Sequence, residues 1–241
     1  MKSQKEKLVP PQPVRKAGVK AVTPADAATL IIWRKRNTGI EVLMGERHHT
    51  HRFMPQRYVF PGGKVDPHDA RVRSSTELSK ATTKQLERTS RKGRARSIGI
   101  AAIRETYEET GLMIGDFDPK PHCAAPLGWN NFFSTGLAPA LNRLIYIARA
   151  VTPVFRPTRF DARFFLIGVE EVTGELNGSG ELQNLNWFSV SDTENIELAN
   201  VTRNVLRYAE KFVRQQPKDT AVREVPYFKH LRGGGHAKIM Q

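Results

Sequence analysis

Three glutamate residues, Glu105, Glu108 and Glu109, are the side chains of this chain best suited to bind a divalent metal ion. They follow Arg104 within residues 102–112, which read Ala-Ile-Arg-Glu-Thr-Tyr-Glu-Glu-Thr-Gly-Leu. Residues spaced at i, i+3 and i+4 share one face of an α-helix, and apolar residues fall on the opposite face. Grouped carboxylates repel one another, and their oxygen atoms suit Mg²⁺ or Mn²⁺. The spacing therefore favours a metal site, and a solvent-exposed glutamate-rich helix face is the alternative.

A second segment, residues 58–69, combines a sharp break in the chain with acidic side chains. It reads Tyr-Val-Phe-Pro-Gly-Gly-Lys-Val-Asp-Pro-His-Asp. An apolar run suited to a β-strand ends at the proline before Gly62 and Gly63. Two glycines allow close approach of the backbone, and their carbonyl oxygens are further ligands for a cation. Asp66 and Asp69 follow directly, so this segment strengthens the metal-site interpretation.

These two segments resemble the two halves of the Nudix box, the motif of the Nudix hydrolase family. The box runs from a glycine through five residues to a glutamate, and seven residues later to Arg-Glu-aliphatic-x-Glu-Glu-x-Gly-aliphatic. Gly63 matches the opening glycine, and Asp69 stands where the first glutamate is expected. The second half is matched by Arg104, Glu105, Glu108, Glu109, Gly111 and Leu112, with Thr106 at an aliphatic position. Here 34 residues separate Asp69 from Arg104, so the box carries a long insertion.

The resemblance implies an α+β fold of the Nudix type, an α/β/α sandwich with a mixed β-sheet between helices. The apolar patterns of the chain agree with such a fold. Strands are expected at residues 28–33, 40–44, 58–60, 143–149 and 163–169, and helices at 76–89, 97–110 and 201–215. Residues 115–139, which are rich in Pro, Gly and Asn, are expected to form a long loop.

The resemblance also implies a metal-dependent hydrolase of the pyrophosphatase type. In such enzymes a metal-activated water attacks a phosphorus of a nucleoside diphosphate that is linked to another group. Glu108 and Glu109 would be direct ligands of Mg²⁺ or Mn²⁺, and the Gly63 carbonyl would complete the set. Glu105 would be a further ligand or a base that acts through water. Arg104 would pair with an acidic side chain and hold the geometry of the loop.

Glu181 is the candidate for a catalytic base supplied by a distant loop. It lies shortly before Trp187, and some members of the family place a base at this distance before a comparable tryptophan. A solvated loop glutamate is the alternative. Weaker candidates in the same region are Glu170, Glu171 and Glu175.

The insertion and two arginine-bearing segments resemble the branch of the family that cleaves coenzyme A and acyl-coenzyme A at the diphosphate. A signature of that branch has Arg, three residues, Gly, three residues and Phe-Pro-Gly-Gly. Arg52 and the final tetrapeptide fit, but Gln56 replaces the glycine, and an expected threonine-bearing segment is missing. Candidate phosphate contacts are Arg52, Arg159 and Arg163, because a guanidinium binds phosphate through two hydrogen bonds. A surface position or ion pairing with Asp161 is the alternative.

The formal net charge of +14 invites a nucleic-acid interpretation, but the excess lies outside the expected catalytic core. Residues 1–20 carry +5, residues 70–96 carry +7 and residues 216–241 carry +3. The first two of these runs contain no aromatic residue, which weakens an RNA-binding interpretation, although basic surface steers polyanionic substrates. An RNA-directed Nudix enzyme and a catalytically inactive Nudix module that senses a ligand are the alternatives. The retained glutamates favour the enzyme.

The chain of 241 residues is long enough for one core with extensions. Residues 1–24 are expected to be a disordered basic arm with several prolines, and residues 25–215 the Nudix domain, interrupted by the basic insertion at about 70–96. Residues 216–241 are expected to be a basic extension.

One cysteine excludes an intrachain disulfide and fits a reducing cytoplasm. Without an expected signal peptide or membrane span, a cytoplasmic enzyme with a small-molecule substrate is expected.

Overall fold

The computed structural model describes residues 18, 20–37, 39–49, 55–119, 126, 128–177, 179–215, 223–231 and 236–241. Arg52 and most of the expected N-terminal arm lie outside these ranges.

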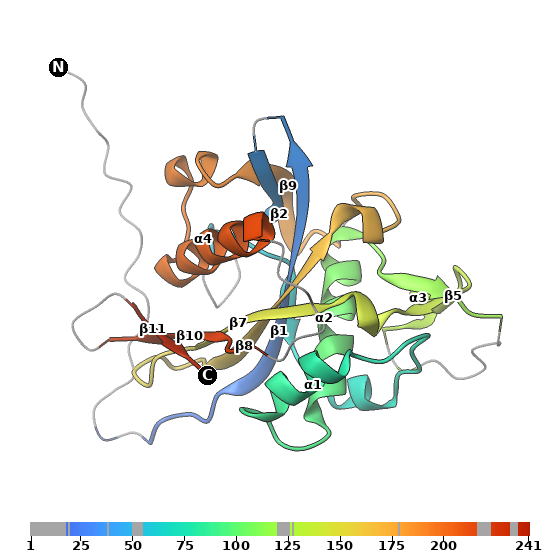
Figure 1. The fold of residues 1–241 in the computed structure, drawn as a ribbon, viewed down its shortest axis with the longest axis horizontal. Helices are drawn as coiled ribbons and strands as arrows, with labels where there is room; N and C mark the ends of the chain where they lie inside the picture. Colours follow the sequence, from blue (N-terminus) through green and yellow to red (C-terminus); the bar gives the residue numbers. More distant parts are fainter. Residues whose placement is uncertain are drawn as a thin grey trace.

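Among the described residues, a nine-stranded mixed β-sheet forms the centre of the molecule (Figure 1). Its strands are β1 (Ala25–Arg36), β2 (Gly39–Arg47), β3 (Tyr58–Val59), β4 (Gly62–Lys64), β7 (Ile145–Val151), β8 (Phe160–Gly168), β9 (Leu182–Ser189), β10 (Pro226–His230) and β11 (His236–Met240). The order is β11-β10-β7-β8-β1-β2-β3, with β4 paired to β1 and β9 paired to β2. The pairs β1–β8 and β7–β10 are parallel, and the other pairs are antiparallel.

Helices cover both faces of this sheet (Figure 1). On one face lie α1 (Lys80–Glu87) and α2 (Arg94–Thr110), and on the other lies α4 (Asn200–Gln215). The expected α/β/α sandwich with a mixed sheet is confirmed. None of the helices in the described ranges has the length and apolar character that a membrane span requires.

Two apolar cores, one on each face of the sheet, explain why the central strand is apolar along its length. Leu30 and Ile32 belong to the core beneath α2, whereas Ile31 belongs to the core beneath α4. Side chains alternate across a strand, so a strand covered on both faces is a continuous apolar run. This run predicts β1 correctly, although the strand extends further at both ends than residues 28–33.

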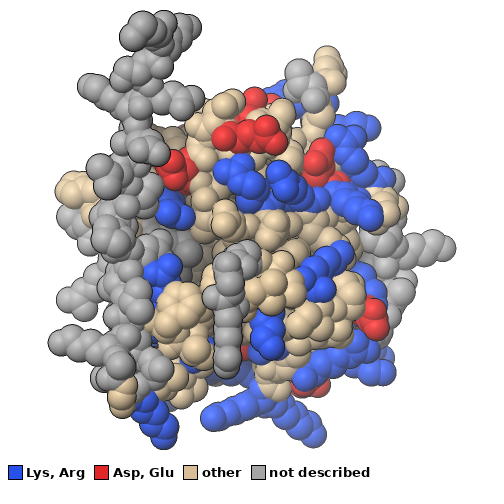
Figure 2. Space-filling model, turned by 90° about the vertical axis from the view of Figure 1, so that its left-hand side faces the viewer, with Lys and Arg blue, Asp and Glu red and all other residues tan. Residues whose placement is uncertain are grey.

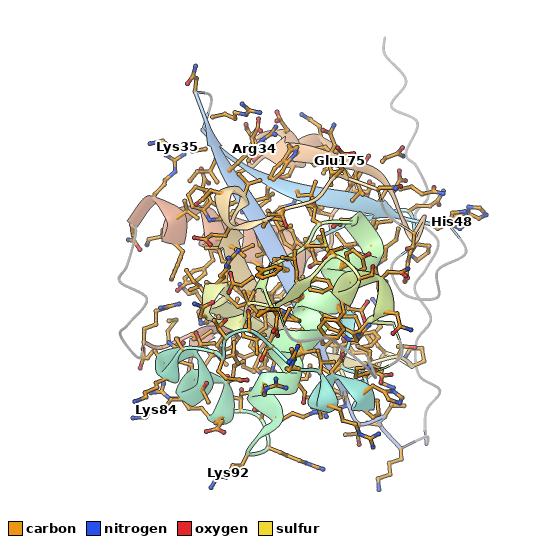
Figure 3. The ribbon with its side chains drawn as sticks, turned by 90° about the vertical axis from the view of Figure 1, so that its right-hand side faces the viewer. Arg34, Lys35, His48, Lys84, Lys92 and Glu175 are labelled. Carbon is orange, nitrogen blue, oxygen red and sulfur yellow. The ribbon has the colours of Figure 1, made fainter. Side chains whose placement is uncertain are left out.

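The insertion in the box is part of the core, and its charge alone suggested a solvated surface segment. Leu78 and Leu86 are buried in the core beneath α2. The Ser79 hydroxyl caps α1 by accepting a hydrogen bond from a backbone N–H. The basic residues lie on the outer side, where Lys84 and Lys92 point away from the molecule (Figure 3). A short amphipathic segment thus carries a large charge and still buries its few apolar side chains.

The expected loop 115–139 also contains ordered structure. It forms β5 (Gly115–Phe117), α3 (Asn130–Phe133) and β6 (Leu137–Pro139), with β5 and β6 paired as a small separate sheet. The reason is an aromatic cluster, because Trp129, Phe132 and Phe133 are buried in the core beneath α2. Burial of such rings offsets the cost of ordering a segment rich in Pro and Gly.

Residues beyond Gln215 extend the sheet. β10 runs parallel to β7, with Phe228 opposite Ala150, and β11 pairs antiparallel to β10. Phe228 is buried in the core beneath α4. The segment expected to be a basic extension therefore supplies two strands, and a domain boundary at residue 215 stays a prediction.

Candidate active site

The helix α2 carries the three glutamates, and its end is set by Gly111. Gly111 has a φ of +76°, and a Cβ there would lie 2.7 Å from the backbone oxygen of Glu175, so only glycine fits. Thr106, at an aliphatic box position, is fully buried and donates its hydroxyl to the Ala102 carbonyl at 2.7 Å. The hydroxyl group that Thr106 brings to an aliphatic box position is therefore hydrogen-bonded within the helix itself.

The two box glycines let β4 pass close to its neighbours. Gly62 has a φ of +152°, and a Cβ there would lie 2.4 Å from the Ala28 carbonyl oxygen. A Cβ on Gly63 would lie 2.4 Å from the Glu105 carboxyl carbon. The glycine pair therefore holds the backbone of β4 directly against the acidic face of α2.

Arg104 connects the two halves of the box. Its Nε and Nη2 donate to the two carboxylate oxygens of Asp69 at 2.9 and 3.2 Å. Its Nη1 donates to Glu105 Oε1 at 2.8 Å and to Glu108 Oε2 at 2.9 Å, and Nη2 also donates to the Lys64 carbonyl. Burial opposes the charge of Arg104, but the hydrogen bond that it donates to Asp69 and the nearby carboxylates raise its pKa. These partners agree with the pairing role that the sequence predicts.

Asp69 stands in place of the first box glutamate and has two partners. It lies in the 3₁₀ helix η1 (Pro67–Arg71), is fully buried, and also accepts the backbone N–H of Asp66 at 2.7 Å. Its shorter side chain still reaches Arg104. Asp69 thus anchors the loop and the helix to each other.

The three glutamates have unusual protonation equilibria because they are close together and partly out of water. Burial raises the pKa of Glu109 to about 8, against the hydrogen bond from Gly62 N–H and the charge of Arg47. Burial also raises the pKa of Glu105 to about 7, against Arg104 and with added repulsion from Glu108 and Glu181. The pKa of Glu108 is raised as well, chiefly by burial. Burial thus favours the neutral forms of these carboxyl groups, and a bound cation would favour their charged forms.

The carboxylates have the chemistry of a divalent-cation site but are not gathered as ligands. In the described part of the chain no three Asp, Glu, His or Cys side chains are grouped to hold a metal ion. One oxygen of each glutamate accepts from Arg104 or from Gly62 N–H. The second oxygen of each has no hydrogen-bond partner among the described residues. Three hard oxygen donors fit a divalent cation.

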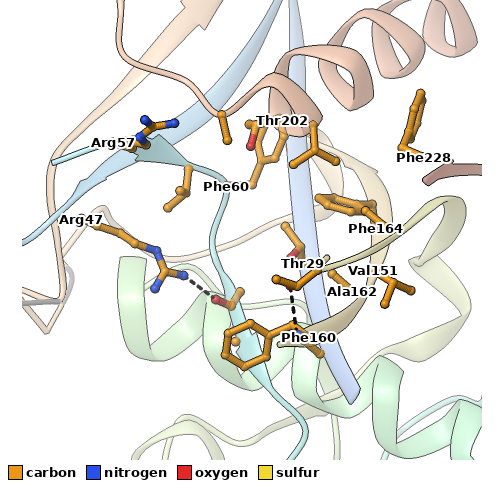
Figure 4. Close-up of a pocket in the computed structure, with 18 of the residues that line it drawn as sticks. Thr29, Arg47, Arg57, Phe60, Val151, Phe160, Ala162, Phe164, Thr202 and Phe228 are labelled. Carbon is orange, nitrogen blue, oxygen red and sulfur yellow. Dashed lines mark hydrogen bonds between the residues drawn. The ribbon is translucent and has the colours of Figure 1, made fainter. Parts of the chain in front are cut away.

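A cleft of about 1060 Å³ begins at these glutamates and continues beneath the start of α4 (Figure 4). Glu105, Glu108 and Glu181 line it beside Gly62 and Gly63, and this part is termed the glutamate end. The structure thus brings Glu181, which directly precedes β9, to the box residues. Glu170, Glu171 and Glu175 do not line this cleft.

The arginines proposed from sequence as phosphate contacts are placed differently. Arg163 is 1% exposed and donates to Asp26, to the Thr89 carbonyl and to the Asp161 carbonyl, and its guanidinium also pairs with the Asp161 carboxylate. Arg159 donates to the backbone oxygens of Thr152 and Val22. Neither lines the cleft. The sheet therefore uses both arginines in its own structure, which is the alternative noted from sequence.

Other cationic side chains, which no sequence motif indicates, also line the cleft. Arg47 at the end of β2 directs its Nη2 to the Gly62 carbonyl at 3.5 Å (Figure 4). Arg57, Arg156 and Lys64 also line the cleft. Each belongs to a different element, so their convergence is visible only in the folded chain.

The chain is similar to known Nudix proteins, although no protein-family model matches it. The "Putative nudix hydrolase 7" of Caenorhabditis elegans is 27% identical over 181 residues, which cover 67% of this chain and 50% of that protein. The chain thus spans about half the length of this curated relative. The crystal structure of a NUDIX hydrolase from Alicyclobacillus acidocaldarius has a TM-score of 0.62 and 28% identity, and the match covers 79% of this chain and 92% of that one.

The similarity in sequence and the similarity in fold point to the same family. In this chain the fold carries a glycine loop and a glutamate helix that match the two halves of the Nudix box. In sequence and in fold the chain is thus similar to proteins named as Nudix hydrolases.

Proposed function

We propose that this chain hydrolyses a diphosphate linkage in a nucleoside diphosphate-type substrate, with Mg²⁺ or Mn²⁺ as cofactor. The observation that carries the proposal is the meeting of Glu105, Glu108 and Glu181 at one end of a large cleft. A concave site with a few convergent charged groups of raised pKa is the usual form of an active site. Nudix hydrolases generally use divalent metal ions and act on substrates of this type.

The residues that would hold the metal ion are Glu105, Glu108, Glu109 and the carbonyl oxygen of Gly63. A bound cation would neutralise phosphate oxygens, lower the pKa of a water molecule and align it with phosphorus. The oxygens of the three glutamates without hydrogen-bond partners among the described residues support this assignment. The close approach of Gly63 to Glu105 supports the inclusion of the carbonyl.

The proton of the attacking water goes to a carboxylate of this chain. We assign this role to Glu181, with Glu105 as the second candidate. Glu181 lines the cleft, and its charge adds to the rise in pKa of Glu105, Glu108 and Glu109. Arg104 is a positioning residue, because it ties Asp69 to Glu105 and Glu108.

Within this class, coenzyme A or an acyl-coenzyme A is the substrate we propose. The cleft is large for a diphosphate alone, and the rings of Phe60, Phe160, Phe164 and Phe228 also line it (Figure 4). Gln56 has a φ of +55°, the left-handed conformation that glycine adopts most readily. Its backbone thus matches the glycine of the coenzyme A signature although its side chain does not.

Hydrolysis assays of the purified chain with Mg²⁺ and Mn²⁺ test this function. The substrates are coenzyme A, acyl-coenzyme A, ADP-ribose, dinucleoside polyphosphates, NADH and nucleoside triphosphates. Attack on a diphosphate is expected to release two phosphomonoesters from coenzyme A. Turnover of other diphosphates but not coenzyme A would contradict the substrate and retain the reaction. Binding without turnover of any compound would instead support the ligand-sensing alternative.

A further inference from the structure

Arg57 and Arg156 line the same cleft as the first residues of α4. Arg57 directly precedes β3, and Tyr58 N–H donates to the Glu197 carbonyl at 3.0 Å, which ties β3 to the segment leading into α4. Arg57 lies on the Thr202 side of the cleft, whereas Arg47 points to Gly62 (Figure 4). This part of the cleft, formed by Arg57, Arg156 and the first residues of α4, is termed the arginine end.

The second arginine reaches the same space from the connection between β7 and β8. Arg156 lines the cleft, and its guanidinium lies 5.3 Å from the ring centre of Phe155. Burial and the positive charge of Arg57 lower the pKa of Arg156. Two guanidinium groups that repel each other across a partly dehydrated space are stabilised by an anion between them.

Nothing in the described structure neutralises this pair. Neither arginine makes an ion pair with a described carboxylate, and the side chain of Glu197, which also lines the cleft, is exposed to solvent. Lys and Arg side chains are also more abundant than Asp and Glu on the face shown in Figure 2. The excess positive charge at the arginine end is therefore available to a ligand.

The start of α4 adds a third source of positive potential. Asn200, Val201 and Thr202 line the cleft and form the first turn of this 16-residue helix. The first N–H groups of a helix have no partners within it, and the helix dipole is positive at this end. These groups therefore face the same space as the arginines and add to their attraction for an anion.

The arginine end is separate from the glutamates. β4 pairs with β1, and β1 pairs with β8, which follows Arg156 in the chain. Two strand spacings thus separate Gly63 from β8, a distance of about 10 Å. The glutamate helix α2 and the helix α4 also pack on opposite faces of the sheet. The two phosphorus atoms of a diphosphate share one bridging oxygen, so a diphosphate held at the glutamates is not expected to reach the start of α4.

We propose that Arg57, Arg156 and the start of α4 bind a phosphate group that the substrate carries apart from its diphosphate. The proposal deepens the proposed function, because it restricts the substrate to diphosphates with a third, remote phosphate. Phosphate is the ligand chemistry that two guanidinium groups and a helix N-terminus recognise together.

Binding measurements without metal test this site independently of catalysis. Isothermal titration of the chain in EDTA at low salt compares adenosine 3′,5′-bisphosphate with AMP, and NADP⁺ with NAD⁺. In at least one pair the additional phosphate is expected to strengthen binding to the wild-type chain about tenfold or more. Arg57→Gln and Arg156→Gln should each reduce this gain to about threefold or less. The exposed Arg88→Gln, with the same change in charge, should retain it.

Two results would overturn the proposal. Equal affinity of the wild-type chain for both members of each pair would show that a remote phosphate is not recognised. Equal weakening of all four ligands in Arg57→Gln and Arg156→Gln would place these arginines on the diphosphate itself. Circular dichroism and thermal unfolding of each variant identify loss of the fold. Failure of hydrolysis in every assay would leave these binding results unaffected, so the two proposals fail separately.

Discussion

The glutamate end and the arginine end of the cleft are assembled in different ways. At the glutamate end, one turn of α2 supplies Glu105, Glu108 and Arg104, one short strand supplies the glycines, and the residue before β9 supplies Glu181. At the arginine end, the contributing groups come from the residue before β3, the β7–β8 connection and the start of α4. The first end thus lies mostly in two short segments that sequence motifs indicate, whereas the second is assembled from segments that no motif indicates. We expect the first to govern turnover and the second to govern which diphosphate binds.

The largest expected effect is loss of stability in Arg104→Met. Asp69 is fully buried, and Arg104 is its cationic partner, so the variant leaves a buried carboxylate unpaired. We expect the free energy of unfolding to fall by about 3–5 kcal/mol, measured by urea titration in EDTA. Arg88→Met, at an exposed position, should change it by about 0.5 kcal/mol or less. A loss below about 1 kcal/mol for Arg104→Met would show that the network does not hold the glutamate end together.

Glu108→Gln should lower turnover while the fold stays intact. Its side chain is 37% exposed and the change nearly preserves its shape, so unfolding should be little affected. We expect kcat to fall about 100-fold or more, which corresponds to about 2.7 kcal/mol. Mn²⁺ titration should show weaker binding, which a merely structural role would not produce. Glu194→Gln, at an exposed position, is the matched control, and unchanged Mg²⁺-dependent hydrolysis in Glu108→Gln would refute the assignment.

Phe160→Ala should change KM more than kcat. Phe160 lines the cleft and is not among the proposed metal ligands, so truncation removes contact between its ring and the substrate (Figure 4). We expect KM for the preferred substrate to rise about tenfold, or about 1.4 kcal/mol, with a smaller change in kcat. Phe117→Ala, where the ring is 75% exposed, serves as the control. A fall in kcat that exceeds the rise in KM would show that the two ends do not act separately.

The smallest effect is expected for Gln56→Gly. Glycine at this position relieves the left-handed strain but loses more entropy on folding, so Gln56→Gly should change the free energy of unfolding by less than about 1 kcal/mol. Gln56→Val places a β-branched side chain at positive φ and should cost about 1–3 kcal/mol. Thermal unfolding of the two variants measures the difference. Similar stabilities for both would mean that the turn before Arg57 does not depend on this conformation.

The glutamate end could be predicted from sequence because its geometry is that of one helix. The spacing of Glu105, Glu108 and Glu109 places them on one face, and Gly111 marks the end of the helix. Even Asp69, 35 residues before Arg104, was identifiable from its distance to Gly63. The motif does not reveal the partners of the glutamates. Glu105 and Glu108 pair with Arg104, and Glu109 accepts from Gly62 N–H, so the three are not grouped as metal ligands.

The arginine end could not be predicted because no short segment contains it. Arg57 and Arg156 are about a hundred residues apart and join only when β3 and the β7–β8 connection pack near α4. The partners of Arg163 are equally distant in sequence, which explains why the sequence indicated it as a phosphate contact. Only the register of β1 against β8 reveals that Asp26 and Asp161 are its partners. The net charge of the insertion does not indicate that its few apolar side chains are buried in the core.

The hydrogen bond from Gln85 Nε2 to the Arg223 carbonyl, at 2.9 Å, joins the box insertion to the segment that leads into β10. This contact and the parallel pairing of β10 with β7 both need residues near the C-terminal end of the sequence. During synthesis on the ribosome, the glutamate helix is complete long before these residues emerge. Until these residues emerge, the edge of β7 that later pairs with β10 presents backbone N–H and C=O groups without their final partners, so this edge is open to pairing with another chain during that interval.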